Sequence, residues 1–127
     1  MTNMMTENMT RQQVAEVIAA ARAKGEQPNL AYANLTDADL TGLDMTDVNL
    51  TGANMSYTNM DYANLSYATL REANLSGANL TGTNLTAADL TGATLTAADL
   101  EGAGLHGVNL TDADLFRANL AGTGVTA

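Results

Sequence analysis

Apolar residues recur at every fifth position over most of the chain. From residue 30 to residue 125, each position divisible by five is apolar, with sixteen leucines, three methionines and one valine. The residue two positions earlier is usually small, most often alanine, and the residue one position earlier is usually Asn or Asp. Thr or Ser commonly follows the apolar centre, and Gly, Ala, Asp or Tyr comes next. The chain thus repeats one pentad many times.

A period of five fits neither a regular helix nor a flat strand. On a helix, five residues advance about 500°, so successive leucines would point in different directions around the axis. On a flat strand, an odd spacing would send them to opposite faces. They share one interior only if the chain turns a corner in every pentad, where Asn, Asp and Gly favour turns. The pattern therefore predicts an all-β solenoid over residues 28–127, whose coils stack through strand-like hydrogen bonds.

The repeated motif A-(D/N)-L-x-x resembles that of the pentapeptide repeat family. It reads ANL at residues 33–35 and 73–75 and ADL at residues 113–115, and the likeness covers residues 28–127. The resemblance implies a right-handed quadrilateral parallel β-helix with four pentads per coil. Twenty pentads would make about five coils, in a rod roughly 24 Å long at about 4.8 Å per coil. Positions twenty apart would then stack, and the family's abundance suggests a bacterial source.

The residues before the repeat predict a helical cap. Thr10 and Gln13 have the spacing of a capping box, and Gly25 would end a helix over residues 10–24. An apolar stripe, formed by Val14, Val17, Ile18 and Ala21, would cover the first coil. We therefore expect a flexible tail at residues 1–9 and an N-terminal α-helical cap with its linker at residues 10–27. The alternative is that the stripe docks a partner.

Charge is distributed unevenly along the chain, whose formal net charge is -9. The first 28 residues carry as many acids as bases, whereas eleven acids face only Arg71 and Arg117 in the repeat. This balance argues against direct binding to nucleic-acid phosphate. The chain has no cysteine, hence no disulfide, and the sequence shows neither a signal peptide nor a membrane span. We expect a cytoplasmic protein with no membrane contact.

Catalytic chemistry has no evident place in this pattern. His106 is the single histidine, and Thr86, twenty residues earlier, offers it no acidic or basic partner. Asp89 and Asp99 are ten residues apart and would lie on opposite faces, so they do not form a carboxylate pair. No phosphate-binding loop, metal-ligand spacing or nucleophile elbow appears. The sequence predicts no enzyme, and no catalytic, metal-binding or cofactor-binding residue.

Four aromatic residues are candidates for protein binding. Tyr57, Tyr62 and Tyr67 occupy the same outward position in three consecutive pentads. Either each ring fills a gap beside the small or acidic residues stacked next to it, or the three form a partial aromatic belt that binds a protein. Phe116 follows a centre of the last coil, which no predicted element covers. It is either an incidental exposed ring or an anchor for a contact at this open end, where a homodimer is possible.

One wall of the predicted rod carries acids and no base from the repeat. These acids are Asp39, Asp61, Asp99 and Glu101, and they serve either solubility or a specific role. We expect a non-catalytic structural scaffold or protein-protein interaction module, with an unidentified protein partner. Some members of the family are acidic DNA mimics that bind DNA gyrase, inhibiting it or protecting it from quinolones, and this is the alternative. Against it, no centre is Phe, only about five coils are expected, and no helix is predicted after residue 120.

Overall fold

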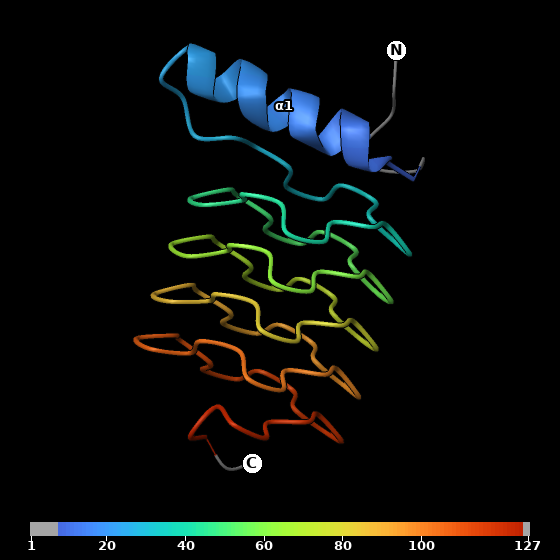
Figure 1. Cartoon of the computed structure of the whole chain (residues 1–127), viewed down its shortest axis with the longest axis vertical. Coiled ribbons are helices and arrows are strands. Elements are labelled where there is room, and N and C mark those ends of the chain that lie inside the picture. The colour runs from blue at the N-terminus through green and yellow to red at the C-terminus, as the bar shows by residue number, and fades with distance from the viewer. Residues whose placement is uncertain (1–7, 126–127) are drawn as a thin grey trace.

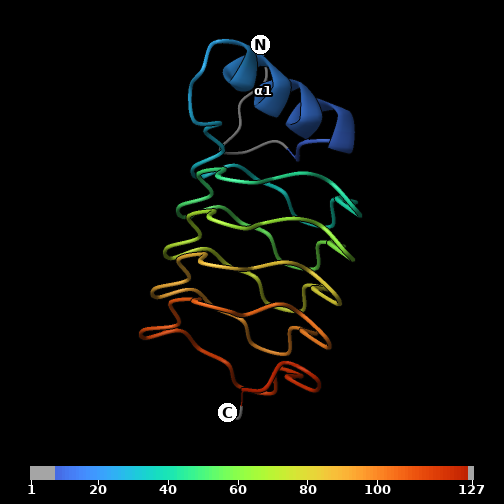
Figure 2. The ribbon, with the colours of Figure 1, turned by 60° about the vertical axis from the view of Figure 1, so that its left-hand side comes forward.

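The computed structural model describes residues 8–125 of the chain. One helix, α1 (Arg11–Ala23), lies across the end of a stack of coils that begins near Asn29 (Figure 1). The described residues contain no extended strand, and parallel β-bridges of one residue per pentad join each coil to the next. A second view shows the same stack of similar coils below the helix (Figure 2). The molecule is a solenoid rod with a helix over one end.

Successive coils stack with a period of twenty residues. Asn29 bridges Asn49, Asn49 bridges Thr69, and the same spacing continues along the rod. Each centre from Leu30 to Leu100 donates its N–H to the next coil, as Leu50 does to the Thr69 carbonyl at 2.7 Å. The residue before a centre donates to the preceding coil, as Asn49 does to the Pro28 carbonyl at 2.9 Å. One coil therefore contains four pentads, as the family resemblance implied.

Each pentad turns its corner through a hydrogen-bonded β-turn. The Ala53 N–H donates back to the Leu50 carbonyl at 3.0 Å, and Gly52 between them has a φ of 66°. A positive φ at the third residue is typical of a type II turn. Asn49 braces the turn, since its Oδ1 accepts hydrogen bonds from the N–H and hydroxyl of Thr51 at 3.1 and 2.7 Å. Turn geometry thus explains the recurrence of Asn or Asp before the centre and of Thr after it.

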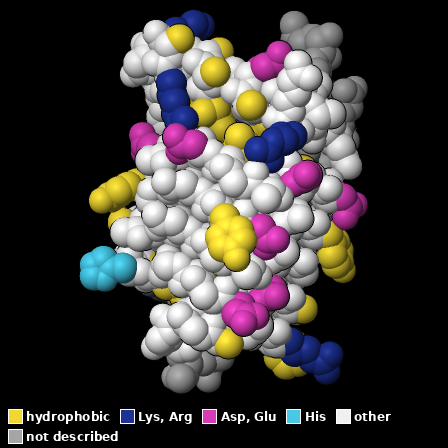
Figure 3. All heavy atoms as spheres, in the orientation of Figure 1, with side chains coloured by type: hydrophobic (Ala, Val, Ile, Leu, Met, Phe, Trp, Pro, Cys, Tyr) yellow, Lys and Arg dark blue, Asp and Glu magenta, His cyan; other side chains and the backbone are white. Residues whose placement is uncertain are grey.

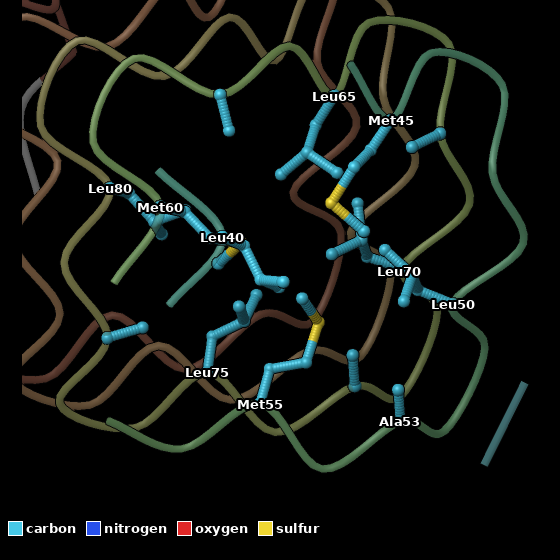
Figure 4. Packing of buried hydrophobic residues seen from close by; sticks show 14 of the residues in the cluster. Leu40, Met45, Leu50, Ala53, Met55, Met60, Leu65, Leu70, Leu75 and Leu80 are labelled. Atoms are coloured by element: carbon cyan, nitrogen blue, oxygen red, sulfur yellow. The ribbon is translucent and has the colours of Figure 1, made fainter. Parts of the chain in front are cut away.

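The apolar centres point inward and fill the rod. Centres from the different walls converge on its axis, and Met45 lies beside Leu65, as the twenty-residue register predicted (Figure 4). The centres from residue 30 to residue 100 are at most 1% exposed. Thr58 replaces the usual inward alanine, and its hydroxyl donates to the Met55 carbonyl at 2.7 Å, so the buried oxygen has a partner. The core is one continuous apolar column.

Helix α1 follows the sequence signals closely. The Gln13 N–H donates to the Thr10 hydroxyl at 3.1 Å, and the Thr10 N–H donates to Gln13 Oε1 at 2.9 Å. The helix stops just before Gly25, whose φ is 70°. Val14 and Ile18 are buried in the same apolar cluster as the centres of the first coil. The apolar stripe of α1 therefore faces the rod.

The segment before the repeat also supplies hydrogen-bond donors to the first coil. The carbonyls of this coil that point toward α1 have no preceding coil to donate hydrogen bonds to them. Unpaired backbone groups are unfavourable away from water. The donors come from both ends of α1 and from the residues before it. Such bonds run from Met9 N to Asn34 O (2.9 Å), from Arg11 Nη1 to Asp39 O (3.3 Å) and from Arg22 Nη2 to Thr46 O (2.9 Å).

Two residues assigned to the flexible tail from the sequence instead contact the first coil. Asn8 forms a parallel bridge with Asn34, and Met9 is only 4% exposed. Burial of the methionine side chain and the backbone pairing hold this short stretch against the coil. The rest of the predicted tail, residues 1–7, lies outside the described residues. The capping segment thus includes Asn8 and Met9.

Candidate interaction surface

The corner residue with a positive φ carries its side chain outward from the rod. Glycine often fills this position, but every tyrosine of the chain also occupies one. The φ values are 62° at Tyr32, 58° at Tyr57 and Tyr62, and 63° at Tyr67. A left-handed backbone costs a non-glycine residue about 1–2 kcal/mol and is uncommon for a bulky side chain. The tyrosines are therefore placed where glycine would suit the backbone better.

The rings of Tyr57 and Tyr62 lean along the rod onto glycines of the next coil. A Cβ atom added to Gly77 would lie 2.5 Å from Cε1 of Tyr57, and one added to Gly82 would lie 2.5 Å from Cε1 of Tyr62. Each ring thus occupies the space that a missing side chain leaves, which is one of the two interpretations drawn from the sequence. The outer side of each ring stays free, since Tyr57 is 66% exposed and Tyr62 is 70% exposed.

Tyr32 is a fourth member of this group that the sequence analysis did not single out. It occupies the same corner position, is 59% exposed, and leans over Gly52 in the same way. Its spacing from the apolar centre, together with a glycine twenty residues later, was the signal available in the sequence. With Tyr57, Tyr62 and Tyr67, it gives each of the four corners one tyrosine. The 35 residues that separate the first from the last correspond to a rise of roughly 8 Å.

Two acids of the predicted acidic wall, Asp39 and Asp99, lie in line along one side. Asp39 bridges Asn59, Asn59 bridges Asn79, and Asn79 bridges Asp99, so these four side chains occupy equivalent positions in successive coils. Two further acids lie at the adjoining corner. The backbone N–H of each donates to the side chain of the residue two positions before it, which belongs to the line. These bonds run from Asp61 N to Asn59 Oδ1 (3.2 Å) and from Glu101 N to Asp99 Oδ1 (3.0 Å).

The structure brings two of the tyrosines to the edges of this wall. Asn59 lies in the wall, and Tyr57 and Tyr62 stand at the corners before and after it. We call the surface formed by Tyr57, Tyr62, Asp39, Asp61, Asp99 and Glu101 the acidic tyrosine face. Tyr67 lies at the next corner and Phe116 near the far end, so neither belongs to it. Figure 3 shows one side of the rod, where acidic side chains gather around a protruding aromatic ring.

The electrostatics of the face differ from the expectation at one point. Sequence analysis placed no base on this wall, but Arg11 of α1 reaches it and donates to the Asp39 carbonyl at 3.3 Å. A hydrogen bond from the Thr41 hydroxyl lowers the pKa of Asp39, and the Thr41 N–H and the Arg11 charge act in the same direction. Helix α1 thus brings a positive charge to the end of the wall, which the position of Arg11 in the sequence alone did not reveal.

Among residues 8–125, the remaining acids of the face form no ion pair. The ion pairs among the described residues are Arg22–Asp44 at 3.4 Å and Arg71–Asp89 at 3.2 Å, and neither includes an acid of this face. In addition, Oδ1 of Asp61 is shielded from solvent and accepts no hydrogen bond. An unmade bond at a shielded polar atom is unfavourable. The face therefore presents negative charge that the described residues leave unpaired.

The coil farthest from α1 is partly open. Its centres Leu110, Leu115 and Leu120 are half-buried, unlike the fully buried centres of the middle coils. Phe116 is 64% exposed, and the Arg117 guanidinium lies over its ring at 5.3 Å from the centroid. No described element covers this end (Figure 1).

Metal-binding clusters do not form among the described residues. His106 is exposed at a corner of the rod. Across residues 8–125, no group of three or more His, Cys, Asp or Glu side chains could hold a metal ion. In the same part of the chain, no helix has the length and apolar character needed to cross a membrane.

Comparison with known families identifies the repeat. The family described as pentapeptide repeats matches in eight copies, over residues 29–66, 58–96 and 94–123. The chain belongs to the pentapeptide repeat family. Proteins of this family form right-handed quadrilateral β-helices and are generally non-catalytic. A comparison with curated proteins gives no match.

Solved pentapeptide repeat structures resemble the rod. Rfr23 from the cyanobacterium Cyanothece 51142 is 37% identical, with 70% of this chain and 60% of that chain covered and a TM-score of 0.69. HetL from the cyanobacterium Nostoc sp. strain PCC 7120, involved in heterocyst differentiation regulation, is 33% identical over 78% of this chain and 55% of its own, with a TM-score of 0.48. QnrB1, a plasmid-mediated fluoroquinolone resistance protein, is 20% identical, with 76% of this chain and 49% of that chain covered and a TM-score of 0.68. This chain thus spans about half to three fifths of their lengths.

Proposed function

We propose that this pentapeptide repeat protein is a non-catalytic scaffold that binds a protein partner through the outer surface of its rod. The observation that carries the proposal is the set of exposed tyrosines at corners with positive φ. Glycine would relieve about 1–2 kcal/mol of backbone strain at each corner, so the backbone conformation does not favour tyrosine there. Tyrosine is enriched at protein interfaces because it combines a large apolar ring with a hydrogen-bonding hydroxyl.

The rod provides a rigid frame for such contacts. Its backbone is hydrogen-bonded from coil to coil, and its centres are buried, so exposed side chains are held at fixed positions. A preorganised surface loses less conformational entropy on binding than a flexible one. The absence of enzymatic activity, the cytoplasmic location and the bacterial source expected from the sequence all belong to this proposal.

The test is capture of a partner that depends on the exposed rings. The wild-type protein and a variant with all four tyrosines replaced by glycine and Phe116→Thr are immobilised and incubated with a lysate of the source organism. Mass spectrometry with mild cross-linking then quantifies the retained proteins. We expect at least one protein to be enriched by the wild type and lost from the variant. Identical retention by both, with the variant folded, would contradict the proposal.

The acidic DNA mimic that binds DNA gyrase is the second candidate. The excess of acids over bases in the repeat favours it. Charge density weighs against it: the acids of the acidic tyrosine face are spread over residues 39–101, about 15 Å of rod at about 4.8 Å per coil. A DNA duplex presents about nine charges in that length, at one per 1.7 Å. The likeness to QnrB1, at 20% identity, concerns the fold alone.

A supercoiling assay separates the two candidates. If the protein is a scaffold for another partner, DNA gyrase activity should not change when this protein is present in large excess. Inhibition, or relief of quinolone inhibition, that is lost when the acids of the face are neutralised would instead favour the DNA mimic.

We also propose self-association through the coil that carries Leu110, Leu115 and Leu120. These centres are half-buried, and their N–H groups have no acceptor among the described residues. An edge with free backbone groups and partly exposed leucines can pair with a second copy. Its test is given in the Discussion.

A further inference from the structure

The acidic tyrosine face combines two features that separately have ordinary explanations. Scattered acids commonly keep a surface hydrated, and a single exposed ring needs no special role. Here, however, the twenty-residue register places Tyr57 and Tyr62 on either side of the line that contains Asp39 and Asp99. Rings and carboxylates therefore share one surface, a combination suited to a cationic group with a flat face.

Arginine matches this surface better than lysine or an apolar side chain. Its guanidinium is planar, stacks on aromatic rings, and donates paired hydrogen bonds to carboxylates. The molecule already contains one such contact, since the Arg117 guanidinium lies 5.3 Å from the centroid of the Phe116 ring. Asp61 has a carboxylate oxygen without a hydrogen bond, and rotation of its side chain would expose that oxygen to an incoming donor.

The charges of the face are available to a partner. Arg22 and Arg71 pair with acids on other walls, and Arg11 reaches only the end of the wall beside Asp39. Asp61 and Glu101 make no ion pair among the described residues. The stretch of rod from Asp39 to Glu101, about 15 Å, corresponds to about five residues of extended chain. A short segment with a few arginines would span the face.

We propose that the acidic tyrosine face binds an arginine-bearing extended segment of the partner protein. The inference rests on the proposed function, since it names the surface and the chemistry of the partner. Tyr57 and Tyr62 stack on guanidinium groups, and Asp61, Asp99 and Glu101 accept their hydrogen bonds. The tyrosines at the other two corners, Tyr32 and Tyr67, do not take part.

The test measures binding of a defined peptide probe by fluorescence anisotropy. The probe is a labelled nine-residue peptide in which arginine alternates with glycine, and two comparison peptides carry lysine or citrulline instead of arginine. We expect the arginine peptide to bind more tightly than the lysine peptide, and the citrulline peptide to bind weakly or not at all. No measurable binding of the arginine peptide to the wild-type protein would overturn the proposal.

Two matched pairs of variants locate the binding site. Tyr57→Gly with Tyr62→Gly removes the rings of the face, and Tyr32→Gly with Tyr67→Gly removes as many rings elsewhere. Glycine suits the backbone at all four corners, so both pairs should fold, which circular dichroism checks. We expect the first pair to weaken binding about tenfold and the second less than twofold, from the usual strength of exposed cation–π contacts. Equal effects would overturn the proposal.

The acids are tested in the same way, with net charge held equal. Asp61→Thr with Glu101→Thr installs the residue usual at that position of the repeat, as do Asp112→Gly and Asp114→Asn elsewhere. Each pair removes two negative charges, so general attraction to a cationic peptide weakens equally. A stronger effect of the first pair supports the face as the site, whereas equal effects would show unspecific attraction and overturn the inference.

Failure of this inference can be distinguished from failure of the proposed function. If capture from the lysate depends on the exposed rings but the arginine peptide does not bind the face, the scaffold proposal stands and the inference is wrong. If capture is independent of the rings, the proposed function fails whatever the peptide does.

Discussion

In each pentad, the second residue after the apolar centre adopts a positive φ, and its identity determines which side chain the rod presents outward at that corner. Gly42 and Gly82 fill two of these corner positions in the same column, on either side of Tyr62. No atom of residues 8–125 lies within 4 Å of a Cβ added to Gly42, whereas one added to Gly82 would meet the Tyr62 ring. Glycine thus has two distinct uses here, backbone freedom at one corner and room for a ring at the other.

This difference gives a prediction about stability. Gly42→Ala should lower the free energy of unfolding by about 1 kcal/mol, the usual strain of a left-handed non-glycine residue. Gly82→Ala should cost about 1 kcal/mol more, because the Tyr62 ring must leave its packing position. Urea unfolding measures both, and adding Tyr62→Gly to Gly82→Ala should remove the excess. Equal costs for the two single variants would show that the ring is not packed on Gly82.

Hydrogen bonds from threonine hydroxyls make some carboxylates sensitive to acid. The Thr91 hydroxyl lowers the pKa of Asp89, and the Thr91 N–H and Arg71 act in the same direction, against the opposing effect of burial. The Thr46 hydroxyl lowers the pKa of Asp44, helped by the Thr46 N–H and Arg22, again against burial. Because both pKa values are lower in the folded chain than in the unfolded chain, the ionised carboxylates stabilise the fold above the ordinary pKa of Asp, about 4.

The stability supplied by these two carboxylates should therefore be lost as the pH falls below about 4, through the lowered pKa values of the folded protein. Urea unfolding at several pH values should show a shallower acid dependence for Asp44→Asn with Asp89→Asn than for the wild type. Asparagine fills this position in many pentads, so the turns should persist. The control is Asp112→Gly with Asp114→Asn, which removes the same charge. Equal slopes for the two pairs would contradict the assignment.

At the scale of elements, α1 acts on the rod in two ways. Its buried Val14 and Ile18 cover the centres of the first coil, and Arg11 and Arg22 donate to carbonyls at the coil edge. The capping box and the apolar stripe could be predicted because they are local patterns. The contacts of Arg11 and Met9 could not be predicted, since they depend on where the helix lies relative to the first coil.

Loss of this packing should open the rod from one end. Ile18→Ala should lower the free energy of unfolding by about 2–4 kcal/mol, as expected for a buried isoleucine. Hydrogen exchange should accelerate most for amides of residues 30–45 and least for the middle coils, because each coil contacts only its neighbours. Glu16→Ala, at an exposed site of α1, is the control. Uniform acceleration along the rod would contradict coil-by-coil stability.

At the scale of the whole molecule, the period of five determined most of the fold in advance. An odd spacing of apolar centres requires a corner in every pentad. The stacking of Met45 with Leu65 followed from the four pentads per coil that the family resemblance implied. The surface was less predictable. Tyr57 and the acids of the wall were recognised separately, and Tyr32 was missed. The reason is that corner side chains come together on a wall through the stacking of coils, and not through closeness in the sequence.

Self-association is a property of the whole rod and can be measured directly. Light scattering on a size-exclusion column should show a dimer that forms with rising concentration in the wild-type protein. Phe116→Asp should abolish it, because the ring lies beside the partly open coil. Tyr67→Asp places the same charge at a similarly exposed ring in the middle of the rod and should leave the dimer intact. A monomer at all concentrations for every variant would contradict self-pairing.

The central claim is that the acidic tyrosine face contacts a protein partner in the cell. A photoreactive phenylalanine analogue placed at position 62, or in turn at 57, 32 or 67, tests it most directly. After irradiation of living cells, we predict a discrete cross-linked adduct from positions 62 and 57 and little from 32 and 67. Adducts of equal yield from all four positions, or from none of them, would contradict the account.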